Sequence, residues 1–110
     1  VTDLARCDVF EAVEDAFRYD KMILCASSYD ADLFPPMTQF LNVLKIKAYQ
    51  KRKVAMVENG SWAPSAARIM KSYVEGFKDV TLAEPVVTIR STLKDADVPK
   101  LEEMVEALLA

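Results

Sequence analysis

The chain has 110 residues, of which 52% are hydrophobic, and a formal net charge of −3 from 14 basic and 17 acidic side chains. Its size and composition indicate one domain over residues 1–110 with enough apolar residues for a core. They give no sign of a basic stripe for nucleic acid, of an apolar run of the roughly 20 residues that a membrane span needs, or of a signal peptide, so we expect a cytoplasmic protein.

Four amphipathic helices are predicted in chain order. Asp8 and Glu11 form a capping-box pattern at the start of a helix over residues 8–18. A second begins near Pro36, a third starts at Ala66, and a fourth follows Asp97. The apolar residues at helical spacing, expected to face the core, are Val9, Phe10, Val13 and Phe17, then Met37, Phe40, Leu41 and Leu44, then Ala66, Ile69, Met70, Tyr73, Val74 and Phe77, and last Leu101, Met104, Val105, Leu108 and Leu109.

Short apolar runs between these helices predict strands. Residues 21–26 (KMILCA) are expected to be covered on both faces, and residues 54–57 follow a basic turn at residues 51–53. Residues 80–82 and 86–89, separated by Glu84-Pro85, indicate one interrupted strand or a strand with an extended lead-in. Regular alternation of helices and short apolar strands is typical of βαβ units, so we predict an α/β fold with a parallel sheet.

The sequence excludes several kinds of chemistry. Because histidine is absent, the chain holds no Ser–His or Cys–His nucleophile pair and no His-ligated metal site. We therefore assign no catalytic residue and no metal ligand. Cys7 and Cys25 lack metal-ligand spacing, and reduced thiols are the expected state, with a disulfide as the alternative.

Two polar loops are expected to leave the carboxyl ends of strands, the edge at which open parallel sheets bind ligands. They are residues 27–35 (SSYDADLFP) and residues 58–64 (ENGSWAP), each with an aromatic side chain, Tyr29 or Trp62. A flat aromatic beside backbone amides left free by Gly60 suits a planar heteroaromatic ligand. The alternative is that both loops are ordinary connections between strand and helix.

The two loops carry a resemblance to a known family. SSYDADLFPPM after KMILCA resembles the first flavin-binding loop of the flavodoxin-like domains in A-type flavoproteins (flavodiiron proteins), and VENGSWAPSAA resembles the next loop of those domains. The resemblance implies a three-layer α/β/α flavodoxin-like sheet with strand order 2-1-3-4-5. It also implies FMN binding by Ser27, Ser28, Tyr29 and Asp30 in the first loop and by Asn59, Gly60, Ser61, Trp62 and Ala63 in the second.

The chain departs from the family pattern in the first loop. Ser27 stands where the family usually has Pro, and Asp30 where it usually has Asn. An ionised carboxylate close to the flavin would disfavour the anionic reduced form and lower the reduction potential.

The family also implies a larger oxidoreductase. FMN would pass electrons to a di-iron centre in a metallo-β-lactamase-like domain that reduces oxygen or nitric oxide, and a rubredoxin-type or NAD(P)H-linked donor would supply them. Nothing in the sequence matches the phosphate-binding turn after the family's first strand, and residues 1–4 resemble the end of its second strand. We therefore expect an N-terminally truncated fold, weak or absent FMN binding, and no activity of this part alone. The apolar strand 21–26 becomes an open edge, which predicts self-association as a homo-oligomer.

Two other classes of protein stay open. A receiver-like signalling domain shares the strand order but needs an Asp at a strand end, whereas Asp30 and Asp32 follow the predicted strand 21–26. A cofactor-free interaction module would show no flavin spectrum even with a phosphate-binding segment supplied.

Overall fold

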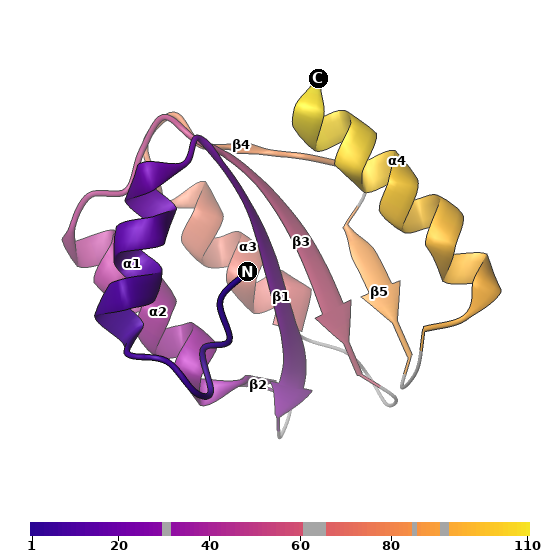
Figure 1. The fold of residues 1–110 in the computed structure, drawn as a ribbon, viewed down its shortest axis with the longest axis horizontal. Helices are drawn as coiled ribbons and strands as arrows, with labels where there is room; N and C mark the ends of the chain where they lie inside the picture. Colours follow the sequence, from indigo (N-terminus) through magenta and orange to yellow (C-terminus); the bar gives the residue numbers. More distant parts are fainter. Residues whose placement is uncertain (30–31, 61–65, 85, 91–92) are drawn as a thin grey trace.

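The computed structural model describes residues 1–29, 32–60, 66–84, 86–90 and 93–110. Helices and strands alternate along the chain, as the sequence predicts (Figure 1). The elements are α1 Val9–Arg18, β1 Lys21–Tyr29, β2 Asp32–Leu33, α2 Pro35–Ile46, β3 Lys53–Asn59, α3 Ala66–Glu75, β4 Thr81–Leu82, β5 Val87–Ile89, the 3-10 helix η1 Asp95–Asp97, and α4 Val98–Leu109. Within these ranges, no helix is long and apolar enough to cross a bilayer.

The sheet is built around β3. Its strand order is β2-β1-β3-β4, and β5 also pairs with β3. β1 runs parallel to β3 from Lys21 opposite Lys53 to Ser27 opposite Asn59. β4 pairs with the start of β3 and β5 with its end, both in parallel, which confirms the interrupted strand. Among the strands in the described ranges, β2 alone is antiparallel to its neighbour, β1.

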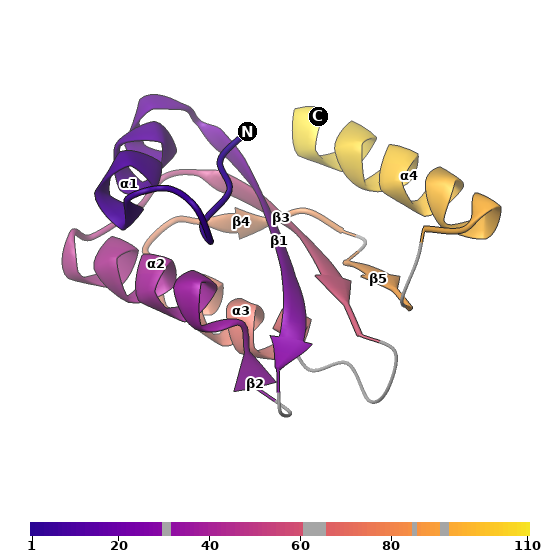
Figure 2. The same ribbon diagram turned by 60° about the horizontal axis from the view of Figure 1, so that its bottom comes forward.

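Helices cover the two faces of the sheet unequally. α1, α2 and α3 lie on one face, and α4 lies on the other, where it packs on β3 and β5 (Figure 2). The larger core cluster fills the space between the sheet and the first three helices, and a smaller cluster around Ala55, Val87, Met104 and Leu108 lies under α4. The predicted core residues of α2 and most of those of α3 are buried. The three-layer arrangement is therefore confirmed, with one thin outer layer.

This inequality corrects the expectation that strand 21–26 is covered on both faces. Leu24 faces the three-helix side and is 2% exposed, whereas its neighbour Ile23 faces the α4 side and is 43% exposed. Cys25 points the same way as Ile23 and is exposed too. α4 covers β3 and β5 but leaves β1 uncovered, so an apolar run that reads as a central strand has one open face.

The first and last helices bury only some of the side chains that the spacing predicts, among them Val13, Met104 and Leu108. In α1 the buried side chains are Ala12, Val13 and Ala16, while Phe10 is 57% exposed. Small residues let α1 lie close to α2, which leaves the larger Phe10 outside the contact. In α4, Val105 and Leu109 are likewise exposed, because the helix contacts the sheet only through the side that carries Met104 and Leu108.

Tyr49 packs in the core at the end of the sheet that lies opposite the predicted ligand edge. Its ring is 1% exposed and meets Phe17 and Phe77 edge-on, with centroid distances of 5.4 and 5.7 Å. Arg52 lies over the same ring at 5.6 Å. The Arg52 guanidinium also donates to the carbonyl oxygens of Phe17 and Tyr19, at 3.1 and 3.0 Å. The basic turn therefore joins the end of α1 to the start of β3 and is more than a solvated connection.

Candidate functional site

The carboxyl ends of β1 and β3 bring the two predicted loops together. In the parallel ladder, Ala26 lies opposite Glu58 and Ser27 lies opposite Asn59. Neighbouring parallel strands are less than 5 Å apart. Residues that are 32 positions apart in the sequence thus become direct neighbours at the edge where open parallel sheets bind ligands.

The first loop is shorter than the sequence predicts. β1 continues through Ser27, Ser28 and Tyr29, and β2 returns antiparallel, with Ser28 opposite Leu33 and Tyr29 opposite Asp32. The Phe34 amide then donates to the Ser27 carbonyl at 3.3 Å. The expectation of an irregular loop over residues 27–35 is wrong, because a short hairpin provides backbone partners that a loop would lack. This hairpin fixes the backbone of Ser27 to Tyr29.

The second loop also begins later than expected. Glu58 and Asn59 belong to β3, and the Gly60 amide donates to the Ile89 carbonyl at the end of β5, at 3.1 Å. From the sequence, free backbone amides are expected in this turn. That is wrong for Gly60, whose N–H is occupied in holding β3 to β5.

Glu58 is a residue of this edge that the sequence analysis placed in a turn. Glu58 is buried, with 7% exposure. In the sheet its backbone pairs with Ala26 of β1 on one side and Thr88 of β5 on the other. Every second residue of β3 faces the same side of the sheet. Val54, Met56 and Glu58 share one side, on which Val54 and Met56 belong to the larger core. Because residues 54–57 are a continuous apolar run without alternation, the sequence carries no signal that would extend this strand to Glu58.

The starts of α1, α2 and α4 do not suit an anion. α2 starts with Pro35 and Pro36, which lack N–H groups, and Phe34 gives it no side-chain cap. The Asp8 carboxylate accepts from the Phe10 amide at the start of α1, at 2.9 Å. Asp97 accepts from the Lys94 amide at 2.9 Å just before α4. Missing amides and carboxylates both disfavour phosphate there, so these three helix starts do not fit the phosphate of FMN.

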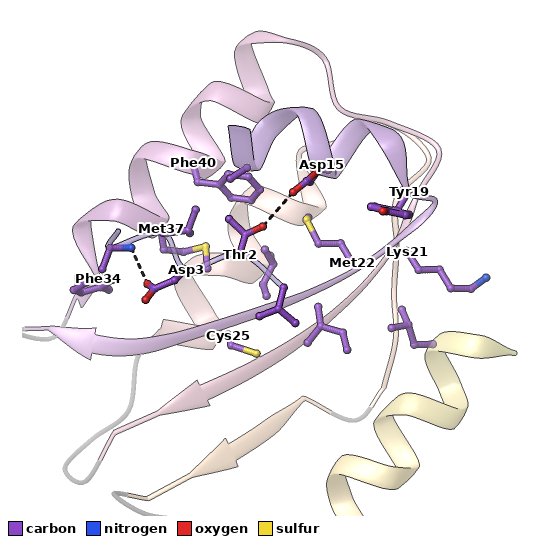
Figure 3. A pocket seen from close by; sticks show the side chains of 18 residues that line it. Thr2, Asp3, Asp15, Tyr19, Lys21, Met22, Cys25, Phe34, Met37 and Phe40 are labelled. Atoms are coloured by element: carbon purple, nitrogen blue, oxygen red, sulfur yellow. Dashed lines mark hydrogen bonds between the residues drawn. The ribbon is translucent and has the colours of Figure 1, made fainter. Parts of the chain in front are cut away.

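A cavity lies beside β1, next to this edge. It has a volume of about 650 Å³ and follows β1 on the side opposite β3, lined by residues 1–5, α1, α2 and one residue of α4 (Figure 3). Toward the carboxyl end of β1 its lining includes Cys25 and Phe34. The sequence does not predict this cavity. Residues 1–4, which resembled the end of a strand, have no strand structure and form part of its lining.

Asp30, Ser61, Trp62 and Ala63 lie outside the described residues, so their assignment to the site stays a prediction. Of the nine predicted site residues, Ser27, Asn59 and Gly60 are placed together at one edge, next to the backbone of Ser28 and Tyr29.

The solved structures that resemble the chain include two that are named here. The rubredoxin oxygen:oxidoreductase of the anaerobe Desulfovibrio gigas superposes with a TM-score of 0.87 at 13% identity, over 96% of this chain and 26% of that one. Oxidised flavodoxin 1 from Bacillus cereus superposes with a TM-score of 0.73 at 19% identity, over 90% of this chain and 74% of that one. The chain therefore has a flavodoxin-like fold. It spans about a quarter of the length of the oxidoreductase. No protein-family model and no curated protein matches the sequence.

Proposed function

We propose that the chain is the FMN-binding electron-transfer domain of an A-type flavoprotein, a flavodiiron oxygen or nitric oxide reductase. One observation carries this proposal: the register of β1 and β3, which makes Ser27 the neighbour of Asn59 at the carboxyl edge of a flavodoxin-like sheet. This is the edge at which such sheets bind their ligands. Both loops that resemble the flavin loops of the family start from this pair.

The flavin, when bound, supplies the electron-transfer chemistry. The chain's own residues bind the ring and orient it. In this proposal the first segment provides Ser27, Ser28, Tyr29 and Asp30, and the second provides Asn59, Gly60, Ser61, Trp62 and Ala63. The paired backbone of Ser27 and of Gly60 gives these segments a fixed starting point. Trp62 contributes the flat aromatic surface.

The larger assembly is also part of the proposal. Electrons would pass to a di-iron centre in a metallo-β-lactamase-like domain of the whole oxidoreductase and arrive from a rubredoxin-type or NAD(P)H-linked donor. The similarity in fold to a protein named as a rubredoxin oxygen:oxidoreductase supports this assignment. We further propose that residues 1–110 form one domain, that the protein is cytoplasmic, and that the chain self-associates.

The 110 residues should bind FMN weakly. Hydrogen bonds to a charged group contribute about 1.5–3 kcal/mol each, and the starts of α1, α2 and α4 offer no cradle for a phosphate. Losing two or three such bonds weakens affinity by several powers of ten, at about 1.4 kcal/mol per factor of ten. The ring should then contribute most of the binding energy, so riboflavin, which lacks the phosphate, should bind about as well as FMN.

A fluorescence titration tests this function. FMN and riboflavin are each titrated with the wild-type chain, with Trp62→Ala, and with Phe10→Ala, whose exposed aromatic ring lies on α1. We expect similar micromolar or weaker affinities for both flavins and a loss of about tenfold or more in Trp62→Ala, from about 1–3 kcal/mol of stacking. Phe10→Ala should bind like the wild type.

Three results would contradict parts of the proposal. Nanomolar affinity for FMN with a strong preference over riboflavin would reveal a phosphate site that this account lacks. Equal binding by Trp62→Ala and the wild type would remove Trp62 from the site. If no flavin binds even with a phosphate-binding segment supplied, the cofactor-free interaction module becomes the better assignment.

A further inference from the structure

We propose that Glu58 is a specificity-determining residue of the flavin site, and that its carboxylate accepts a hydrogen bond from the imide N–H of the isoalloxazine ring. This role rests on the proposed FMN function. It adds a residue outside the nine that the sequence predicts for the site, and it names the group of the ligand that this side chain recognises.

Glu58 lies at the carboxyl edge, between the two segments that form the proposed site. It directly precedes Asn59, which lies opposite Ser27 in the ladder. Its own backbone pairs with Ala26 of β1 on one side and with Thr88 of β5 on the other. Strands on both sides therefore hold the backbone of Glu58 in place, next to the pair from which both segments start.

The side chain of Glu58 shares a face of the sheet with the first segment. Residues two apart on a strand face the same side. Met56 belongs to the larger core, so Glu58 faces the side of the sheet that this core covers. On β1, Leu24 belongs to the same core, and so does Leu33, which pairs with Ser28. Ser28 therefore faces that side too, as a diagonal neighbour of Glu58.

The Glu58 carboxylate is a buried acceptor without a partner in the described part of the chain. The residue is 7% exposed, and no hydrogen bond or ion pair joins its side chain to another described residue. Its ladder neighbour Ala26 has no polar side-chain atom to offer. Among the described residues, the fully enclosed side-chain oxygen without a partner is that of Tyr49, so the Glu58 oxygens are not sealed off. An unpaired, largely buried carboxylate is costly, and a donor on a ligand would remove that cost.

The chemistry of the ring decides which donor this is. An ionised carboxylate can only accept hydrogen bonds. The oxidised isoalloxazine ring has a single N–H group, in the imide between two carbonyl groups. A few well-placed polar groups fix the orientation of a ligand in its site, whereas stacking on a side chain such as Trp62 tolerates many orientations of a flat ring. Glu58 would therefore orient the ring by its imide edge.

Riboflavin and 3-methylriboflavin, in which a methyl group replaces the imide proton, are the probes for this role. A trace of each flavin is titrated with excess protein, and the quenching of its fluorescence gives the two dissociation constants. The chains compared are the wild type, Glu58→Gln, Glu58→Ala and Glu84→Gln. Glutamine keeps the size of the side chain and a neutral acceptor, and alanine removes the acceptor and makes room for the methyl group. Glu84, at an exposed position before β5, is the matched control.

We expect the wild type to bind riboflavin at least tenfold more tightly than 3-methylriboflavin, because the methyl group leaves the carboxylate unpaired. Glu84→Gln should show the same ratio. The ratio should fall about threefold in Glu58→Gln, since a neutral acceptor makes a weaker bond than a charged one. In Glu58→Ala it should reach about one. A residue with a purely structural role would change the resistance to urea without changing this ratio.

Two kinds of result would overturn the role of Glu58. A ratio near one in the wild type, or an unchanged ratio in either Glu58 variant, would overturn this role and leave the flavin site itself in place. Absence of saturable riboflavin binding by the wild type would overturn it together with the proposed function. Because Glu58→Gln keeps the volume of the side chain, the comparison stands even if Glu58→Ala does not fold.

Discussion

Ser27, near the end of β1, lies directly opposite Asn59, at the end of β3, in a parallel ladder that begins six residues earlier with Lys21 opposite Lys53. Because the register is continuous over this length, a shift at one end would displace the other. A one-residue slip would turn either Leu24 of β1 or Val54 and Met56 of β3 away from the larger core, depending on which strand moves. Burial along the strands therefore fixes the position of the site residues at their ends.

Asp30 should set the reduction potential of a bound flavin. An ionised carboxylate opposes the added negative charge of the reduced ring, so Asp30→Asn should raise the midpoint potential by on the order of tens of millivolts. A redox titration of the flavin-loaded chain measures the shift. Asp20→Asn, at the start of β1 and thus at the opposite end of the sheet, is the matched control. Equal shifts in both variants would show that Asp30 has no special place near the ring.

The hydroxyl group of Tyr49 should not stabilise the folded chain. The buried Tyr49 oxygen has no hydrogen-bond partner in the described structure. A buried polar group without a partner costs about 1–3 kcal/mol. Tyr49→Phe should therefore leave the free energy of unfolding unchanged or raise it by about 1 kcal/mol, as measured by urea denaturation at pH 7. Tyr19→Phe, at an exposed position, should be neutral. A loss of stability in Tyr49→Phe would reveal a partner for the hydroxyl.

The same residue predicts an alkaline loss of stability. Burial raises the pKa of Tyr49 to about 12 from its usual 10.0, with the nearby Arg52 acting in the opposite direction. Between these values the unfolded chain loses a proton that the folded chain keeps, so the free energy of unfolding falls as pH rises. The loss should reach about 2–3 kcal/mol by pH 12, at about 1.4 kcal/mol per unit. Denaturation curves from pH 9 to 12 for the wild type and Tyr49→Phe give the difference. Parallel pH profiles would contradict this linkage.

Self-association should depend on the uncovered face of β1. Ile23 is exposed there, beside Cys25, on the side that α4 leaves open. Sedimentation equilibrium should show wild-type oligomers at high concentration and a larger monomer fraction for Ile23→Lys. Val105→Lys adds the same charge on α4 and should behave like the wild type. A wild-type chain that stays monomeric at high concentration would contradict the proposal.

Much of this fold can be read from the sequence because its signals are local. Asp8 marks the start of α1, and the spacing of Met37, Phe40, Leu41 and Leu44 gives the buried face of α2. Apolar runs of strand length between such helices define the parallel sheet. Each of these patterns lies within a single helix or strand, so it can be recognised without knowing which elements pack against it.

The errors occur where a neighbour decides the outcome. Ile23 belongs to an apolar run, yet it is exposed because α4 packs on β3 and β5. Phe10 has helical spacing, yet small alanines make the contact with α2. Ser28 and Tyr29 continue the strand because β2 pairs with them. At the site, the sequence predicts which two segments meet, whereas the bond from Gly60 to Ile89 requires knowledge of the β5 position.

The most direct test of the flavin site is a map of backbone amide chemical shifts as riboflavin is added to the isotopically labelled chain. The two candidate locations can be told apart by residue: the carboxyl edge holds Ser27, Asn59 and Gly60, and the part of the cavity farther along β1 is lined by Ala16, Met22 and Phe40. The account predicts saturable shifts at Ser27 to Tyr29 and at Asn59 to Ala63, with little change at the cavity residues. Shifts centred on Ala16, Met22 and Phe40 instead, or no saturable shift anywhere, would contradict it.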